Sequence, residues 1–147
     1  MDKLIQFPSR PADLVIGERY LSRWYLIPRN RFLNIYLHEY TGDDADEALH
    51  DHPWYSLSVL LKGKLAEWDQ RGDVRIVERF TELRFRSARY AHRLELITSV
   101  AYTLFITGPV IREWGFHCPK GWRHWKQFTN FHQDGDSSRT GIGCGEH

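Results

Sequence analysis

Cysteines, long apolar runs and net charge are all scarce in this sequence, and each shortage excludes a class of protein. The 147 residues include only two cysteines, Cys118 and Cys144, which are too few for a disulfide framework and fit a reducing cytoplasm. The formal net charge of +1 provides no basic field that would attract nucleic acid. We therefore expect a cytoplasmic protein that does not bind nucleic acid.

Membrane-spanning and nucleotide-binding patterns are absent from the sequence as well. No apolar run approaches the length needed to cross a bilayer, and Met1–Pro8 lacks the apolar core of a signal peptide. The glycines of residues 141–145 have no phosphate-binding lysine beside them. These features predict a soluble protein with no membrane partner and no nucleotide site.

Aromatic residues, by contrast, are plentiful, and they favour β structure or an aromatic-lined cavity. They make up 14% of the chain and include six tryptophans. Short runs rich in aromatic and branched residues, several of them alternating with polar ones, recur between turn signals, which predicts a series of strands. The expected strands are 32–40, 54–61, 65–70, 74–80, 83–85, 93–98, 101–107 and 110–116. With few helical signals between them, they indicate an all-β sandwich or barrel.

The domain organisation is simple. We expect a single β-barrel domain over residues 1–132 and a flexible tail rich in glycine and serine over residues 133–147. Trp122, Trp125 and Phe128 follow one another at three-residue spacing, which predicts one face of a short helix packed on the barrel.

Three histidines carry the strongest functional signal. In a strand, His50 and His52 point to the same face, because side chains alternate between faces. His92 follows near the end of the next pair of strands. A single histidine is more often a structural residue, but three imidazoles from neighbouring strands form a facial metal site with open coordination positions. The pattern therefore predicts a metal centre.

Other residues are candidates for the surroundings of that centre. Trp54 and Ser56 share the strand parity of the histidines and are predicted to line a substrate pocket. Tyr36 and His38 lie on the polar face of a strand that should neighbour the site, where they would supply a catalytic proton donor or support a ligand. The solvated face of a sheet explains these two residues equally well.

Arginines that could hold a substrate carboxylate occur at two places. Arg84, Arg86, Arg89 and Arg93 crowd one stretch, where we expect a solvated face with at most one side chain pointing inward. Arg112 is an equal candidate for binding a substrate anion in the bidentate way that guanidinium groups favour.

The histidine spacing resembles that of a known superfamily. His50, His52, Ser56 and Gly63 match the spacing of the first cupin motif, G(x)5HxH(x)3,4E(x)6G, with serine at the position of the usual glutamate ligand. Residues 87–92 align with the second motif, PxGxxH(x)3N, and keep its histidine, His92. Residues 32–116 thus resemble a small single-domain cupin, similar to cupin-like proteins of bacteria and phages. The resemblance implies a double-stranded β-helix, the cupin jelly-roll barrel, with short flanking helix or loop segments.

The same resemblance implies a chemistry. Three neutral imidazoles without a carboxylate leave the double charge of a divalent metal uncompensated, so such a site favours an anionic, chelating ligand. The site is similar to three-histidine iron sites of cupins such as cysteine dioxygenase and the diketone-cleaving dioxygenases. This implies Fe(II) and a dioxygenase that acts on a small organic acid, thiol or chelating carbonyl compound. Zinc, manganese or nickel would suit the ligands almost as well.

Two alternatives to the dioxygenase remain open from the sequence. One is a non-catalytic cupin that binds a small ligand, and the other is a metal-dependent isomerase or hydrolase. In either case we expect a homodimer formed through strand edges.

Overall fold

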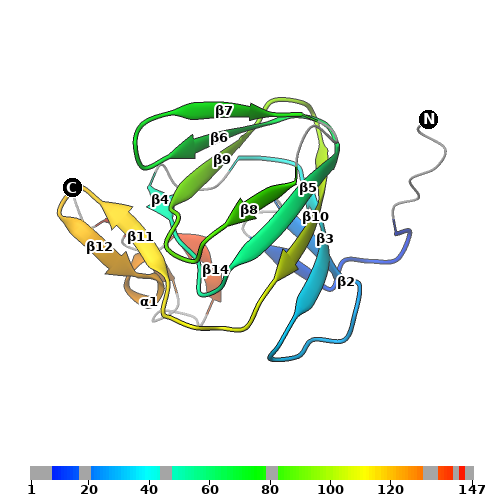
Figure 1. The fold of residues 1–147 in the computed structure, drawn as a ribbon, viewed down its shortest axis with the longest axis horizontal. Helices are drawn as coiled ribbons and strands as arrows, with labels where there is room; N and C mark the ends of the chain where they lie inside the picture. Colours follow the sequence, from blue (N-terminus) through cyan, green and yellow to red (C-terminus); the bar gives the residue numbers. More distant parts are fainter. Residues whose placement is uncertain are drawn as a thin grey trace.

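The strands form two six-stranded antiparallel sheets that together make a barrel, with a third, two-stranded sheet beside it (Figure 1). The computed structural model describes residues 8–16, 21–43, 48–78, 83–130, 136–140 and 143–144. The first sheet has the order β1 (Leu14–Ile16), β2 (Leu21–Tyr25), β3 (Asn34–Tyr40), β10 (Ala101–Thr107), β5 (Ser56–Lys62) and β8 (Arg84–Arg86). The second sheet has the order β12 (Gly121–His124), β11 (Gly115–Cys118), β4 (Leu49–His50), β9 (His92–Leu96), β6 (Leu65–Asp69) and β7 (Val74–Val77).

Helical structure is minor, as the sequence predicted. Among the described residues the helix is α1 (Trp125–Phe128), followed by β13 (Thr129–Asn130), which pairs with β14 (Asp136–Thr140). Trp122, predicted to share the face of this helix, lies instead on β12, while Phe128 stacks on Phe116 with ring centroids 3.7 Å apart. In the part of the chain that the structure describes, no helix has the length and hydropathy needed to cross a membrane.

Most predicted strands are present, and one is largely wrong. The strand β10 has the predicted bounds, 101–107, and β5, β6 and β9 lie within two residues of their predictions. The strand predicted over 110–116 begins only at Gly115. Val110 and Ile111, whose apolar side chains suggested it, project from a loop with exposed fractions of 72% and 55%. The end of the predicted strand 74–80, residues 79 and 80, lies outside the described residues.

The turn between β5 and β6 depends on a glycine of the cupin-like motif. Gly63 has a φ of +84°, a conformation that residues with a side chain rarely adopt. A Cβ atom there would come within 2.3 Å of the carbonyl oxygen of Val100. Glycine is therefore required for both the turn and the close approach to the segment before β10.

The barrel interior is apolar at one end and polar at the other. Leu21, Tyr40 and Ala101 lie in register across β2, β3 and β10 and belong to the apolar core, with Leu60, Leu65 and Val77. At the opposite end of β3 and β10, the buried residues Asn34 and Thr107 lie in register with Ser56 of β5. The seven-residue strands β3 and β10 thus connect a packed core to a region lined with polar side chains.

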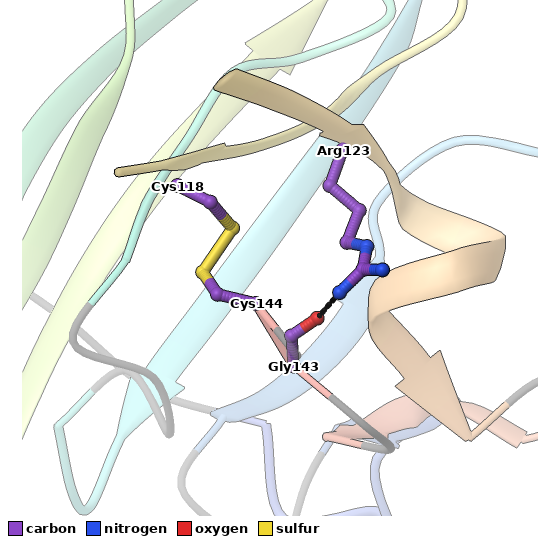
Figure 2. Close-up of a disulfide and its surroundings, with 4 residues drawn as sticks. All are labelled: Cys118, Arg123, Gly143 and Cys144. Atoms are coloured by element: carbon purple, nitrogen blue, oxygen red, sulfur yellow. Dashed lines mark hydrogen bonds between the residues drawn. A yellow bond between two sulfur atoms is a disulfide. The ribbon is translucent and has the colours of Figure 1, made fainter. Parts of the chain in front are cut away.

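The two cysteines form one disulfide. The sequence had not predicted this bond, because so few cysteines fit a reducing cytoplasm. Cys118, at the end of β11, is bonded to Cys144, with Cα atoms 5.5 Å apart (Figure 2). Arg123 Nη1 also donates to the carbonyl oxygen of Gly143 at 2.8 Å. Of the predicted tail 133–147, residues 136–140 form β14, whereas 133–135, 141–142 and 145–147 lie outside the described residues.

Candidate metal centre

The structure brings the three predicted histidines together at the polar end of the barrel. His50 on β4 lies directly opposite His92 on β9, and His52 follows β4 after one residue. Their ring centroids are 4.9 to 5.0 Å apart, and each ring offers a nitrogen within 4.8 Å of the others. His92 is buried, while His50 and His52 are half-buried, so the cluster is reachable from outside the core.

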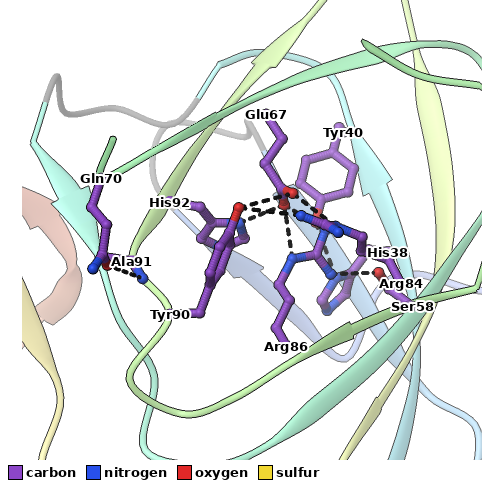
Figure 3. Close-up of polar contacts among 10 residues, drawn as sticks. All are labelled: His38, Tyr40, Ser58, Glu67, Gln70, Arg84, Arg86, Tyr90, Ala91 and His92. Atoms are coloured by element: carbon purple, nitrogen blue, oxygen red, sulfur yellow. Dashed lines mark hydrogen bonds and ion pairs between the residues drawn. The ribbon is translucent and has the colours of Figure 1, made fainter. Parts of the chain in front are cut away.

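A buried carboxylate that the sequence did not identify orients one of these histidines. Glu67 on β6 is 1% exposed, and its Oε2 lies 2.8 Å from Nδ1 of His92 (Figure 3). When Nδ1–H donates a hydrogen bond to the carboxylate, Nε2 carries no proton and can ligate a metal. Glu67 therefore has the role of a supporting carboxylate in known metal sites: it accepts a hydrogen bond from a candidate ligand, His92, and fixes the orientation of its ring.

Two arginines hold Glu67 in place. Arg86 Nε donates to Oε2 at 2.8 Å, and Arg84 Nε donates to Oε1 at 3.1 Å. Arg86 also donates to Ser58 Oγ at 2.7 Å, so this inward-pointing arginine is engaged within the barrel wall. Burial opposes the charge of Glu67, but the hydrogen bond with His92 and the charge of Arg86 outweigh burial and hold its pKa below the usual range. Glu67 is thus ionised at neutral pH.

Two of the three histidines, His52 and His92, have lowered pKa values. Burial lowers the pKa of His92 to about 4, even though Glu67 acts in the opposite direction. Burial and the neighbouring His92 and His50 lower the pKa of His52 well below its usual value. Neutral imidazole is the form that binds a metal. In addition, Nδ1 of His52 is buried and has no hydrogen-bond partner among the described residues, so a cation would satisfy an otherwise unmet nitrogen.

These shifts predict that the metal-free protein loses stability when the pH falls from about 6.5 towards 4. The unfolded histidines take up protons near pH 6.5, whereas His52 and His92 do so in the folded protein only at lower pH. The stabilisation is therefore complete above pH 6.5 and declines below it. Urea unfolding at pH 7, 6 and 5 in the presence of a chelator measures this slope. A free energy of unfolding that is constant across this interval would contradict it.

Asp51, between the two histidines of the motif, points the other way and anchors the neighbouring hairpin. Its Oδ1 accepts from the backbone N–H of Gly115 at 2.9 Å, and its Oδ2 accepts from Trp122 Nε1 at 2.9 Å. His117 Nε2 lies 3.1 Å from the same Oδ2. The carboxylate is 2% exposed. This network fixes the backbone that carries His50 and His52 against β11 and β12.

Arg112, the candidate anion clamp, takes part in the same network. Its Nη1 lies 2.9 Å from Asp51 Oδ1 and donates to the carbonyl oxygens of His52 and Ala88 at 3.1 and 3.3 Å. Burial opposes the charge of Asp51, but the hydrogen bond with Arg112 and that from Gly115 lower its pKa. Substrate binding by Arg112 stays a prediction, and the contacts of Nη1 give this arginine a positioning role.

The predicted pocket residues Trp54 and Ser56 differ in their contacts. Trp54 stacks on His52 with ring centroids 5.0 Å apart. Ser56 is buried, and its hydroxyl has no hydrogen-bond partner among the described residues. The hydroxyls of Thr103 and Thr107 on β10 are unpartnered in the same sense. Since buried polar groups are nearly always satisfied, these three hydroxyls indicate a place for water or a polar ligand.

Tyr36 and His38 lie deeper in the barrel. Trp54 packs on Phe105, and Phe105 stacks on His38, so two aromatic rings stand between His38 and His52. Nε2 of His38 accepts from Arg23 Nε at 2.9 Å, and burial followed by the charge of Arg23 lowers the His38 pKa well below its usual value. Tyr36 stacks on His38. A catalytic role for Tyr36 and His38 stays a prediction. As a base, His38 would have to give up the hydrogen bond that its Nε2 accepts from Arg23.

Comparison with solved structures identifies the fold. DMSP lyase DddQ from Ruegeria pomeroyi DSS-3 has a TM-score of 0.55 and 13% identity, over 79% of this chain and 61% of that one. A cupin-superfamily sugar phosphate isomerase from Silicibacter pomeroyi DSS-3 has a TM-score of 0.52 and 12% identity, over 71% and 74%. Fe(II)-HppE with an alternative substrate has a TM-score of 0.54 and 17% identity, over 70% and 58%.

The match is one of fold rather than of close sequence. This chain corresponds to about half, 51%, of another matching DMSP lyase chain. No protein-family model and no curated protein matches the sequence. The two antiparallel sheets, the HxH motif with its third histidine and these structural neighbours agree with the resemblance seen in the sequence. The chain therefore has the double-stranded β-helix fold of the cupin superfamily.

Proposed function

We propose that His50, His52 and His92 bind a divalent metal, most simply Fe(II), and that the protein is a metal-dependent cupin dioxygenase. Its substrate would be a small organic acid, thiol or chelating carbonyl compound. The observation that carries this proposal is the convergence of three imidazoles, one of them oriented by the buried carboxylate Glu67. Zinc, manganese and nickel suit the same nitrogen ligands.

The residues around the cluster have separable tasks in this proposal. The bound metal would supply a Lewis acid that binds the substrate anion and a centre at which oxygen is activated. Glu67 fixes the tautomer of His92, and Asp51 fixes the backbone of the HxH segment. Trp54 covers His52 and limits water at that side. The unpartnered hydroxyls of Ser56 and Thr107 provide hydrogen bonds for a polar substrate.

A second candidate is a metal-dependent lyase or isomerase that needs no oxygen. The structural neighbours favour it, because they include a DMSP lyase and a sugar phosphate isomerase as well as an Fe(II) protein. Oxygen uptake with the iron-loaded protein, over a panel of thiols, diketones and hydroxy acids, separates the two. Substrate-dependent oxygen consumption supports the dioxygenase, while turnover under argon supports the lyase or isomerase. The small-molecule substrate and the homodimer stay predictions.

Metal binding is tested by stability. For protein purified without a histidine tag, a metal at 100 times its Kd should raise the free energy of unfolding by about 2.7 kcal/mol, because it binds only the folded state. His50→Ala should abolish this gain, since it removes one of three ligands. His124→Ala is the matched control, because His124 contacts Glu113 outside the cluster. An equal gain in the wild type and in His50→Ala would refute the three-histidine site.

A further inference from the structure

A cavity separate from the histidine cluster adjoins the Glu67 network. Its volume is about 460 Å³, within the range of small-ligand sites. The end of β6, the turn after it and the segment from β8 to β9 form its walls. Six of its lining residues offer hydrogen-bond donors: Gln70, Arg71, Arg84, Ser87, Arg89 and Tyr90. None of the three histidines lines it.

The cavity is cationic. Three arginines line it, and the charge of one, Arg84, is paired with Glu67. The acidic lining residue is Asp69, whose Oδ1 already accepts from the backbone N–H groups of Arg71 and Asp73. Arg71 and Arg89 are exposed, and over the described ranges of the chain neither guanidinium group makes a hydrogen bond or ion pair. Their charges are thus available to a ligand.

The uncharged groups are arranged as donors. Gln70 Oε1 accepts from the backbone N–H of Ala91 at 3.2 Å, which leaves the amide N–H₂ of Gln70 for another partner (Figure 3). Arg84 is held by Glu67 and by the hydroxyl of Tyr90 at 3.3 Å, so its guanidinium is fixed at the cavity wall. A fixed guanidinium loses little conformational entropy when it binds an anion.

We propose that this cavity binds a phosphate group, either free or as part of a small phosphate ester. Guanidinium groups pair bidentately with tetrahedral oxyanions, and a phosphate monoester carries close to two negative charges at pH 7. The two arginines that the described residues leave unpaired, Arg71 and Arg89, with the fixed Arg84 and the amide and hydroxyl donors, match that ligand better than they match a singly charged carboxylate. The proposal does not depend on the proposed metal chemistry, because the cavity contains no metal ligand.

The test is a titration of the full chain with inorganic phosphate at low ionic strength, followed by calorimetry. The wild type should show saturable binding, and acetate should bind at least about tenfold more weakly, because it carries one charge. The double variant Arg71→Gln/Arg89→Gln should weaken phosphate binding by at least about tenfold, since two charge-assisted contacts are lost. Arg29→Gln/Arg31→Gln is the matched control, because it removes the same charge elsewhere on the surface.

Each outcome decides the proposal. Saturable binding lost in the cavity variant and kept in the control supports it. The absence of saturable binding, or an equal loss in the control, overturns it, and acetate binding as tight as phosphate binding overturns the choice of ligand. His50→Ala should keep phosphate binding whether or not it keeps metal. Loss of phosphate binding in His50→Ala would place the anion at the histidine cluster instead and would also overturn the proposal.

Discussion

Replacing Glu67 by glutamine is expected to weaken metal binding by about 10- to 100-fold, the usual effect of removing a carboxylate that supports a histidine ligand. The same variant should lower the free energy of unfolding by about 3–5 kcal/mol, because a buried ion pair loses its negative partner. Arg86 is 6% exposed and would keep its charge inside the barrel without compensation. Metal titration and urea unfolding of the metal-free protein measure the two effects separately.

Glu95→Gln is the control for this variant. Glu95 lies on the same sheet and accepts from Trp68 Nε1 at 3.1 Å, but it contacts neither a histidine of the cluster nor Arg86. It should change metal affinity by less than about twofold and stability by about 1 kcal/mol, the value of an ordinary hydrogen bond. Equal effects of the two substitutions on metal affinity would show that Glu67 has no specific link to His92.

Asp51→Asn is expected to have the second-largest effect. The amide keeps one acceptor oxygen but loses the charge that faces Arg112. Its N–H₂ group cannot accept from the donor that it faces, either the Gly115 N–H or Trp122 Nε1. Leaving the half-buried Arg112 without its carboxylate and a donor to Asp51 without an acceptor should cost about 3 kcal/mol of stability. Metal affinity should also fall, because the backbone of the HxH segment is no longer fixed.

Denaturant unfolding and metal titration again provide the measurements. Asp13→Asn is the matched control, since Asp13 also pairs with an arginine, Arg10, and accepts a backbone N–H, from Tyr25, but at the surface. Exposed ion pairs contribute about 0–1 kcal/mol, so the control should change the free energy of unfolding by no more than this. If Asp51→Asn left both stability and metal affinity unchanged, the proposed anchoring of the HxH segment would be wrong.

Local patterns were sufficient to predict most of the barrel. Aromatic and branched residues predicted the strand 101–107, and in β10 Ala101, Thr103 and Thr107 are buried on one face. The Lys62–Lys64 turn was visible from its glycine. The strand predicted to begin at Val110 was wrong. Val110 and Ile111 are residue types that favour strands, but both are exposed and lie in a loop before β11. A sequence pattern records the residue type but not whether a neighbouring strand is present to pair with it.

The residues of the site that are close in sequence were predictable, whereas a residue that is distant in sequence was not. His50 and His52 are separated by one residue, and the position of His92 came from a motif resemblance. Glu67 was missed because its contact with His92 spans 25 residues and appears in no short motif. The expected position of a carboxylate ligand is occupied by Ser56, and the carboxylate that is present approaches from β6 instead. The signal available in the sequence was a glutamate that shares the strand parity of the apolar Leu65 in the predicted strand 65–70.

The bond between Cys118 and Cys144 has a consequence for which metal the protein can keep. Disulfides persist mainly in oxidising surroundings, and in such surroundings ferrous iron is more readily oxidised. A protein that stays cross-linked in use would therefore hold zinc, which has no redox chemistry, more durably than Fe(II). In reducing surroundings that favour bound Fe(II), the two cysteines would instead be expected as thiols, and the covalent link between Cys144 and β11 would be lost.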